Sequence, residues 1–187
     1  MTILPILITG EPVLHRKAEP VAEITPEITA LIEDMFETMD AAPGVGLAAP
    51  QIGVGLRIFV YDYEFDETRL RGVAINPSLI ISEIENIEPD PETESEGCLS
   101  IPTERFPLKR AQEAVLKALD EKGNEYELSV HGWMARIFQH EFDHLDGILY
   151  ADRLISPHRE EAQQAIKEYG WGVPGISWQP GEDDLEP

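Results

Sequence analysis

Two histidines four residues apart are the first residues in this chain whose types and spacing suggest chemistry. His140 and His144 enclose Glu141 in the segment His-Glu-Phe-Asp-His. Side chains at positions i and i+4 share one face of an α-helix, so the two imidazoles could hold one metal ion. Glu141 would project from the flank of that face, where it could take a proton from nearby water. The alternative is a pair of histidines that form hydrogen bonds on a polar helix face and bind no metal.

A catalytic metal site also needs a third protein ligand and an open position for water. Zinc proteases of the HExxH type take that ligand downstream, and one extended pattern ends in Gly-x-x-His. Gly147 matches the glycine of that pattern, but Tyr150 occupies the position of its last histidine. The other downstream candidates lie on the early turns of another expected helix and have no supporting motif; they are His158, Glu160 and Glu161. No downstream residue is therefore a convincing third ligand.

The single cysteine of the chain lies upstream of the histidines. Cys98 stands in the segment Glu-Gly-Cys-Leu-Ser, residues 96–100. A lone cysteine is commonly a small buried hydrophobic residue, but glycine and serine in a polar segment match a core strand poorly. A thiolate and two imidazoles would complete a Cys-His-His ligand set with one position left for water.

A segment of small residues, Gly-Val-Gly-Leu-Ala-Ala-Pro-Gln at 44–51, is the third candidate. Its glycines would let the backbone approach a ligand closely. It has neither the Gly-Lys-Ser/Thr of a phosphate-binding loop nor the glycine spacing of a dinucleotide site. A plain turn is the simplest interpretation. Gln51, however, places a neutral amide donor at the end of a stiff turn, which suits an oxyanion hole.

Taken together, residues 44–51, 96–100 and 140–147 resemble the signature motifs of the peptide deformylases, in that family's order and approximate spacing. Asn-Pro at 76–77 and Ile-Pro at 101–102 also match, and the resemblance covers roughly residues 1–155. The most visible departure is Asp146, where many members carry asparagine. It lies at the end of the expected helix and leaves the ligand set intact.

The resemblance implies a metal-dependent hydrolase that removes the formyl group from the N-terminal formylmethionine of newly made proteins and releases formate. It implies one divalent metal ion, natively Fe(II), with Zn(II) or Ni(II) as substitutes. Matched residue by residue, the metal ligands are Cys98, His140 and His144. Glu141 becomes the general acid and base. Gln51 and the backbone N–H of Leu99 become the donors to the oxyanion.

Further residues are candidates for holding the substrate. Gly46 lies in the loop that, by the resemblance, pairs with the substrate backbone. A pocket for the methionine side chain could use residues near these motifs, although ordinary core packing explains each equally well; they are Val45, Trp133, Ile137 and Phe138. Arg105 stands where many relatives carry an arginine and could contact the substrate backbone or form a surface ion pair. Glu96 and Asp143 could orient the ligand histidines or form structural ion pairs.

The elements that must position these residues follow from local patterns. Thr25-Pro26 predicts a helix start, and apolar residues at helical spacing continue to Met39. We expect strands at 56–63, 73–76 and 79–87, the last two separated by the Asn-Pro break, and a hairpin of strands 114–119 and 126–130.

A helix at 132–146, capped by Gly147, carries the two histidines, and a last helix runs from Ser156-Pro157 to near Gly170. The fold class is therefore α+β, with mainly antiparallel strands packed around the central histidine-bearing helix and a helix at each end of the chain. Residues 1–170 would form a single catalytic domain. An acidic tail containing Gly and Pro, 171–187, would be loosely ordered, and the acidic stretch 83–96 would be a solvated strand edge and loop.

Composition limits the classes of protein. A chain of 187 residues with 42% hydrophobic residues suits one folded domain. A net charge of −22 argues against direct nucleic-acid binding and against docking on an anionic membrane. One cysteine excludes an intrachain disulfide. The chain shows neither the basic start of a signal peptide nor about 18 consecutive apolar residues, so we expect a cytoplasmic protein.

The expected partners are N-formylmethionyl nascent peptides. Contact with the ribosome would lack the basic C-terminal helix that some relatives use, because residues 157–168 mix basic and acidic side chains. Two other functions remain as alternatives. A zinc protease of the HExxH type would take a downstream ligand and be indifferent to Cys98. A non-enzymatic domain with a structural metal would bind the ion without any activity.

Overall fold

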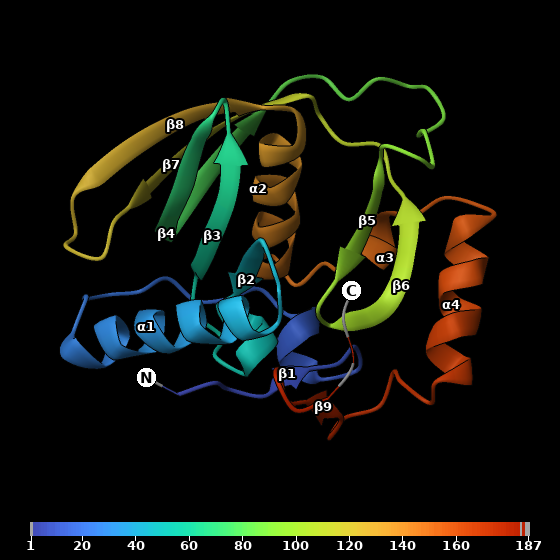
Figure 1. Ribbon diagram of the computed structural model, residues 1–187, viewed down its shortest axis with the longest axis horizontal. Coiled ribbons are helices and arrows are strands. Elements are labelled where there is room, and N and C mark those ends of the chain that lie inside the picture. Colours follow the sequence, from blue (N-terminus) through green and yellow to red (C-terminus); the bar gives the residue numbers. More distant parts are fainter. Residues whose placement is uncertain (1, 184, 186–187) are drawn as a thin grey trace.

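The structure is a computed structural model that describes residues 2–183 and 185. Figure 1 shows its helices and strands. The strands are β1 Ile6–Leu7, β2 Gly46–Ala48, β3 Ile58–Phe65, β4 Thr68–Ile81, β5 Ser95–Cys98, β6 Ile101–Pro107, β7 Glu113–Leu119, β8 Glu125–His131 and β9 Ser177–Trp178. The helices are α1 Pro26–Ala41, α2 Gly132–Leu145, α3 Tyr150–Arg153 and α4 His158–Glu168, with 3-10 turns η1 Pro12–His15 and η2 Ala49–Ile52.

The main sheet is antiparallel and has the strand order β2-β3-β4-β7-β8. Side chains alternate between its two faces along each strand. Ile58 and Val60 of β3 pack in one apolar cluster with Met35 of α1, whereas Phe59 packs in a second cluster with Phe138 of α2. The two helices therefore cover opposite faces of the sheet. Each large apolar side chain so buried contributes about 1.5–3 kcal/mol.

Two small antiparallel sheets complete the fold, one of β5 and β6 and one of β1 and β9. In Figure 1 the β5–β6 hairpin stands beside α2, and the β1–β9 pair lies next to the end of that hairpin. The Cys98 segment thus comes from β5 and the histidines from α2. None of the helices in the described part of the chain combines the length and apolar character that crossing a membrane requires.

Most predicted elements are confirmed, as is the α+β class. Helix α1 begins at Pro26 after Thr25, although the Thr25 side chain makes no capping hydrogen bond. The β7–β8 hairpin and α2 lie where they were expected. Gly147 ends α2 with a φ of 74°, and its N–H donates to the carbonyl of His144 over 3.2 Å. The left-handed backbone explains why glycine stands at this helix end.

The predicted pair of strands at 73–76 and 79–87 is wrong. One strand, β4, runs through the Asn-Pro break with a bulge between Ile75 and Ser78, and it ends at Ile81. The bulge accommodates a proline that has no N–H for the ladder. Asn76, with a φ of 51°, is held there by the backbone of Val21, which it meets through two hydrogen bonds of 2.8 Å. This support comes from a distant segment, so the local pattern could not reveal it.

Other boundaries differ as well. The last helix starts at His158 rather than at Ser156-Pro157, and the short α3 before it was not expected.

The acidic stretch is not wholly solvated, because Glu94 and Glu96 are buried. The tail is not loosely ordered around Trp178, which is only 3% exposed and lies on β9. A two-residue strand that pairs with the other end of the chain leaves no periodic signal.

Candidate active site

Cys98, His140 and His144 come together in the interior. One ligand atom from each lies within 4.8 Å of the others, and all three residues are buried. The Sγ of Cys98 and the Nε2 of His144 are 3.3 Å apart. Two such ligands on one tetrahedral zinc ion would be about 3.5 Å apart. The three residues could therefore hold a single metal ion, and the third ligand comes from upstream of the helix.

The two imidazoles differ in their pKa. Burial lowers the pKa of His144 well below its usual value, so this ring is neutral, the form that binds metals. Burial alone would lower the pKa of His140 too, but the neighbouring Cys98 and Glu96 raise it well above its usual value. A metal ion must therefore displace a proton from His140 when it binds.

Glu96 orients the His140 ring. Its Oε2 lies 2.8 Å from His140 Nδ1, which leaves Nε2 to face Cys98. Burial would raise the pKa of Glu96, but the guanidinium of Arg110 and His140 outweigh that effect and hold the pKa well below its usual range. Arg110 donates two hydrogen bonds of 2.9 Å to this carboxylate, and Arg136 donates one of 2.7 Å. Glu96 therefore contacts a ligand histidine and also forms structural ion pairs, the two roles that were considered for it.

Asp143 forms the ion pairs that were considered for it. Its carboxylate binds Arg110 over 2.6 Å and also pairs with Arg153. Arg110 and Arg136, which hold Glu96 beside the site, were not predicted from the sequence. A signal existed for Arg136, which lies four residues before His140 and so shares its helix face. Arg110 reaches the site from the loop before β7, and nothing in its local sequence indicates that.

Glu141 points into the site with a buried carboxylate. Its Oε2 has no hydrogen-bond partner among the described residues, nor has the Nδ1 of His144. A buried polar atom without a partner is costly unless water or a ligand satisfies it. Burial raises the pKa of Glu141 to about 7, and the nearby His140 opposes that effect. A carboxyl group with a pKa near 7 can both take up and return a proton.

Gly46 makes room for that carboxylate. A Cβ atom built at Gly46 would lie 2.4 Å from Oε1 of Glu141, which is closer than two such atoms can approach. Residues 44–55, expected as a loop, include the edge strand β2 and the turn η2. Strand β2 pairs on one side with β3, and Gly46 stands opposite Tyr61. The glycine is therefore required by the close packing of the strand against α2.

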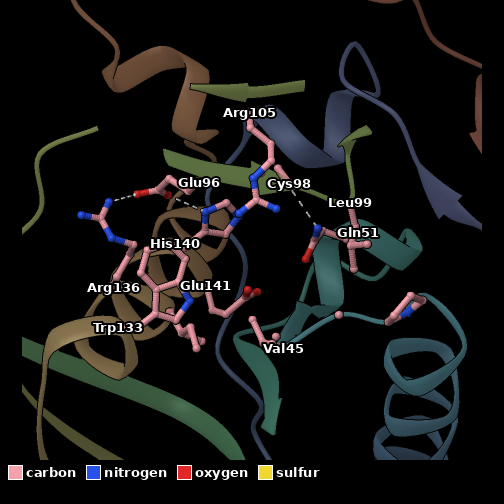
Figure 2. Close-up of a pocket in the computed structure, with 15 residues that line it drawn as sticks. Val45, Gln51, Glu96, Cys98, Leu99, Arg105, Trp133, Arg136, His140 and Glu141 are labelled. Atoms are coloured by element: carbon pink, nitrogen blue, oxygen red, sulfur yellow. Dashed lines mark hydrogen bonds and ion pairs between the residues drawn. The ribbon is translucent and has the colours of Figure 1, made fainter. Parts of the chain in front are cut away.

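Gln51 presents its amide N–H group to the same site. The Ala48 N–H donates to Gln51 Oε1 over 2.8 Å, which fixes the orientation of the amide. Gln51 Nε2 lies 3.9 Å from Cys98 Sγ and 3.4 Å from Ser100 Oγ. Leu99 follows Cys98 in the chain and borders the same cavity. Figure 2 shows Gln51 and Leu99 on one side of the cavity and His140 on the other.

A cavity of about 250 Å³ opens over these groups. Its apolar wall includes Val45, Trp133 and Ile137, three of the four predicted pocket residues. Arg105 also lines it, and Figure 2 shows this side chain directed into the cavity. Phe138 is not part of the wall. It is fully buried against Phe59 and Tyr61, because the opposite side of α2 faces the sheet.

Comparison with known proteins identifies the family. A sequence model described as polypeptide deformylase matches residues 3–160. A peptide deformylase from Mycolicibacterium paratuberculosis is 52% identical and aligns with 97% of this chain and 96% of its own length. The chain belongs to the polypeptide deformylase family. Another deformylase, from Mycolicibacterium smegmatis, is 50% identical over the same shares of both chains.

Solved deformylase structures share the fold. The Legionella pneumophila enzyme superimposes with a TM-score of 0.78 at 36% identity, over 90% of this chain and 96% of that one. The Thermus thermophilus enzyme superimposes with a TM-score of 0.75 at 43% identity, over 89% of this chain and 94% of that one. Deformylases remove the N-formyl group from nascent peptides, and this chain is such an enzyme. Neither a zinc protease nor a non-enzymatic metal domain describes it.

Proposed function

We propose that Cys98, His140 and His144 hold one divalent metal ion, natively Fe(II), which Zn(II) or Ni(II) can replace. The observation that carries the proposal is the convergence of the three ligand atoms within 4.8 Å of one another, beside the buried Glu141 carboxylate. The mixed thiolate and imidazole set suits these metals. Such an ion, when bound, lowers the pKa of water and polarises a carbonyl oxygen.

Glu141 would act as the general base and then as the general acid. Its carboxylate takes a proton from the attacking water as the new bond to the formyl carbon forms. It later delivers that proton to the leaving amine nitrogen, so that the C–N bond breaks and formate is released. A pKa of about 7 supports both transfers near neutral pH.

Gln51 and Leu99 would stabilise the negative charge that develops on the formyl oxygen. The Gln51 amide is already turned toward Cys98, because its oxygen is bound to the Ala48 N–H. The backbone N–H of Leu99 would be the second donor. Donors fixed in advance are effective because they need no reorganisation during the reaction.

The substrate would bind as an added strand. Among the described strands β2 pairs only with β3, so its other edge can pair with an extended peptide near Gly46. The methionine side chain would enter the apolar cavity formed by Val45, Trp133 and Ile137. Arg105, at the same cavity, would contact the substrate backbone.

A formate-release assay on formyl-Met-Ala-Ser tests this function. The protein is loaded without oxygen with Fe(II), Ni(II) or Zn(II), and formate and bound metal are measured together. We expect one metal ion per chain and turnover with iron and nickel. Air should inactivate the iron form faster than the nickel form, because Fe(II) is readily oxidised. Absence of turnover with every metal would contradict the proposal, and equal half-lives in air would contradict native iron.

Gly46→Ala is expected to lower kcat by about 10²-fold, because the new methyl group displaces the Glu141 carboxylate by a distance of order 1 Å. Metal content should not change. Gly55→Ala is the matched control, since its Cβ would meet nothing closer than 3.8 Å. Steady-state kinetics on the same peptide measure both. If Gly46→Ala had the same kcat as the control, the exact position of the Glu141 carboxylate would not be critical for the reaction.

Glu96→Gln is expected to lower the free energy of unfolding by about 1–3 kcal/mol, because two buried arginines each lose one of their carboxylate partners, while Arg110 keeps Asp143 and Arg136 keeps Glu94. Metal affinity should fall about 10–100-fold as the hold on His140 weakens. Chemical denaturation and metal competition measure these effects. Glu83→Gln, an exposed position of the same acidic stretch, serves as the control. An unchanged metal affinity in Glu96→Gln would show that Glu96 does not orient His140 for metal binding.

We propose that the enzyme works in the cytoplasm on nascent peptides, that residues 1–170 form its catalytic domain and that 171–187 form the tail. Helix α4 carries Arg159 and Lys167 against Glu160, Glu161 and Glu168. Contact with the ribosome therefore does not use a basic α4, and the charge of −22 disfavours direct nucleic-acid binding. Co-sedimentation of the enzyme with ribosomes tests this proposal. Binding that is abolished by salt and weakened by charge changes in α4 would contradict it.

A further inference from the structure

The carbonyl of Leu99 accepts a hydrogen bond from the far end of the chain. The indole Nε1–H of Trp178 donates to it over 2.9 Å, and both residues are buried. Trp178 lies on β9, which pairs with β1 at Ile6. The family model ends its match at residue 160, so this contact reaches the active site from beyond the matched region.

The contact falls on the turn that follows Cys98. Leu99 and Ser100 form the two-residue connection between β5 and β6, since Cys98 pairs with Ile101. Two-residue hairpin turns favour types that need a positive φ. Neither Leu99 nor Ser100 has one. The turn is therefore not of these favoured types, and the register of the hairpin shifts beside it, between Gly97 and Cys98, so contacts from outside the hairpin add to its support.

Two outside contacts hold both carbonyls of this turn. The N–H of Thr9, just after β1, donates to the Ser100 carbonyl over 2.8 Å, and Trp178 of β9 holds the Leu99 carbonyl. Figure 1 shows β1 and β9 side by side next to the end of the β5–β6 hairpin. The small sheet of β1 and β9, or the residue just after it, therefore donates both hydrogen bonds that hold the turn with the Leu99 N–H.

We propose that Trp178 is a positioning residue for deformylation, which sets the direction of the Leu99 N–H by holding the Leu99 carbonyl. This rests on the proposed role of Leu99 as an oxyanion donor. The carbonyl and the N–H of Leu99 belong to successive peptide planes that are joined at its Cα by two backbone rotations. Holding the carbonyl, while Cys98 on the other side is held in β5, limits how far the Leu99 N–H can turn. A donor stabilises the transition state only if it is aimed beforehand.

Trp178→Phe removes the N–H and keeps an aromatic ring in the same place. We expect kcat on formyl-Met-Ala-Ser to fall roughly tenfold, less than the about 10²–10³ that follows complete loss of a donor, because the Leu99 N–H is misdirected rather than removed. KM and metal per chain should stay unchanged, since the oxyanion exists only in the reaction.

Two control variants separate positioning from stability. Trp171→Phe makes the same change elsewhere in the tail, where the ring stacks on Tyr169, and should keep the wild-type kcat. Ile6→Val loosens the strand that pairs with Trp178 without removing the indole donor. Melting temperatures are measured for all variants, and kinetics are compared at a temperature where each is folded.

Several results would overturn the proposal. One is a wild-type kcat in Trp178→Phe. Another is a loss of kcat in Trp178→Phe that is no greater than the loss in Ile6→Val when the two variants have the same drop in melting temperature. The third is a change in KM or metal content while kcat stays the same. Failure of Trp178→Phe to fold would assign the bond a purely structural role. A wild-type enzyme without turnover on any metal would instead contradict the proposed function itself.

Discussion

Replacing Glu141 with glutamine is expected to lower kcat for formate release by about 10²–10⁴-fold, the usual contribution of a general acid–base group. Glutamine has nearly the same shape and still fits beside Gly46, but it cannot take a proton from water. The buried carboxylate has one oxygen without a partner among the described residues and a pKa of about 7, so it is available for both proton transfers.

The measurement is steady-state kinetics of Glu141→Gln on formyl-Met-Ala-Ser, with bound metal determined on the same sample. We expect full metal content, because Glu141 is not among the three converging ligands. Glu125→Gln, at an exposed position of β8, is the control and should behave as wild type. A Glu141→Gln enzyme that keeps its kcat would assign the proton transfers to another group.

Cys98→Ala is expected to abolish stable metal binding and, with it, activity. The change removes one of the three proposed ligands and the negative charge that its thiolate would bring, and two imidazoles alone hold a divalent ion weakly. Ser95→Ala, in the same strand β5, is the control and should bind one metal ion per chain. Elemental analysis after loading with Ni(II) and removal of excess metal gives the result directly.

Retention of metal and activity by Cys98→Ala would require a different third ligand. The downstream candidates do not support that outcome. Tyr150 is buried with its hydroxyl donating to the Glu104 carbonyl over 3.0 Å. His158 pairs with Glu161 on α4, 2.8 Å apart. The proposed ligand set therefore depends on Cys98, the only cysteine in the chain.

The sequence by itself determined the chemical types at the site. His140 and His144 could be placed on one helix face because helical periodicity is local and needs no knowledge of the fold. Cys98 could be selected because no downstream ligand was convincing. The further argument that its neighbours do not suit a core strand was wrong, because Cys98 is buried at the end of β5. The β7–β8 hairpin and α1 followed from equally local turn and capping patterns.

Only the tertiary structure decided which residues serve those groups. Gly46 lies against Glu141, Arg110 reaches Glu96 and Asp143, and Trp178 of the tail holds the carbonyl of Leu99. Each contact joins segments that are distant along the chain. Local periodicity reports which face of an element is apolar, but not which distant segment will pack against it, so these partners emerge only when the chain is folded.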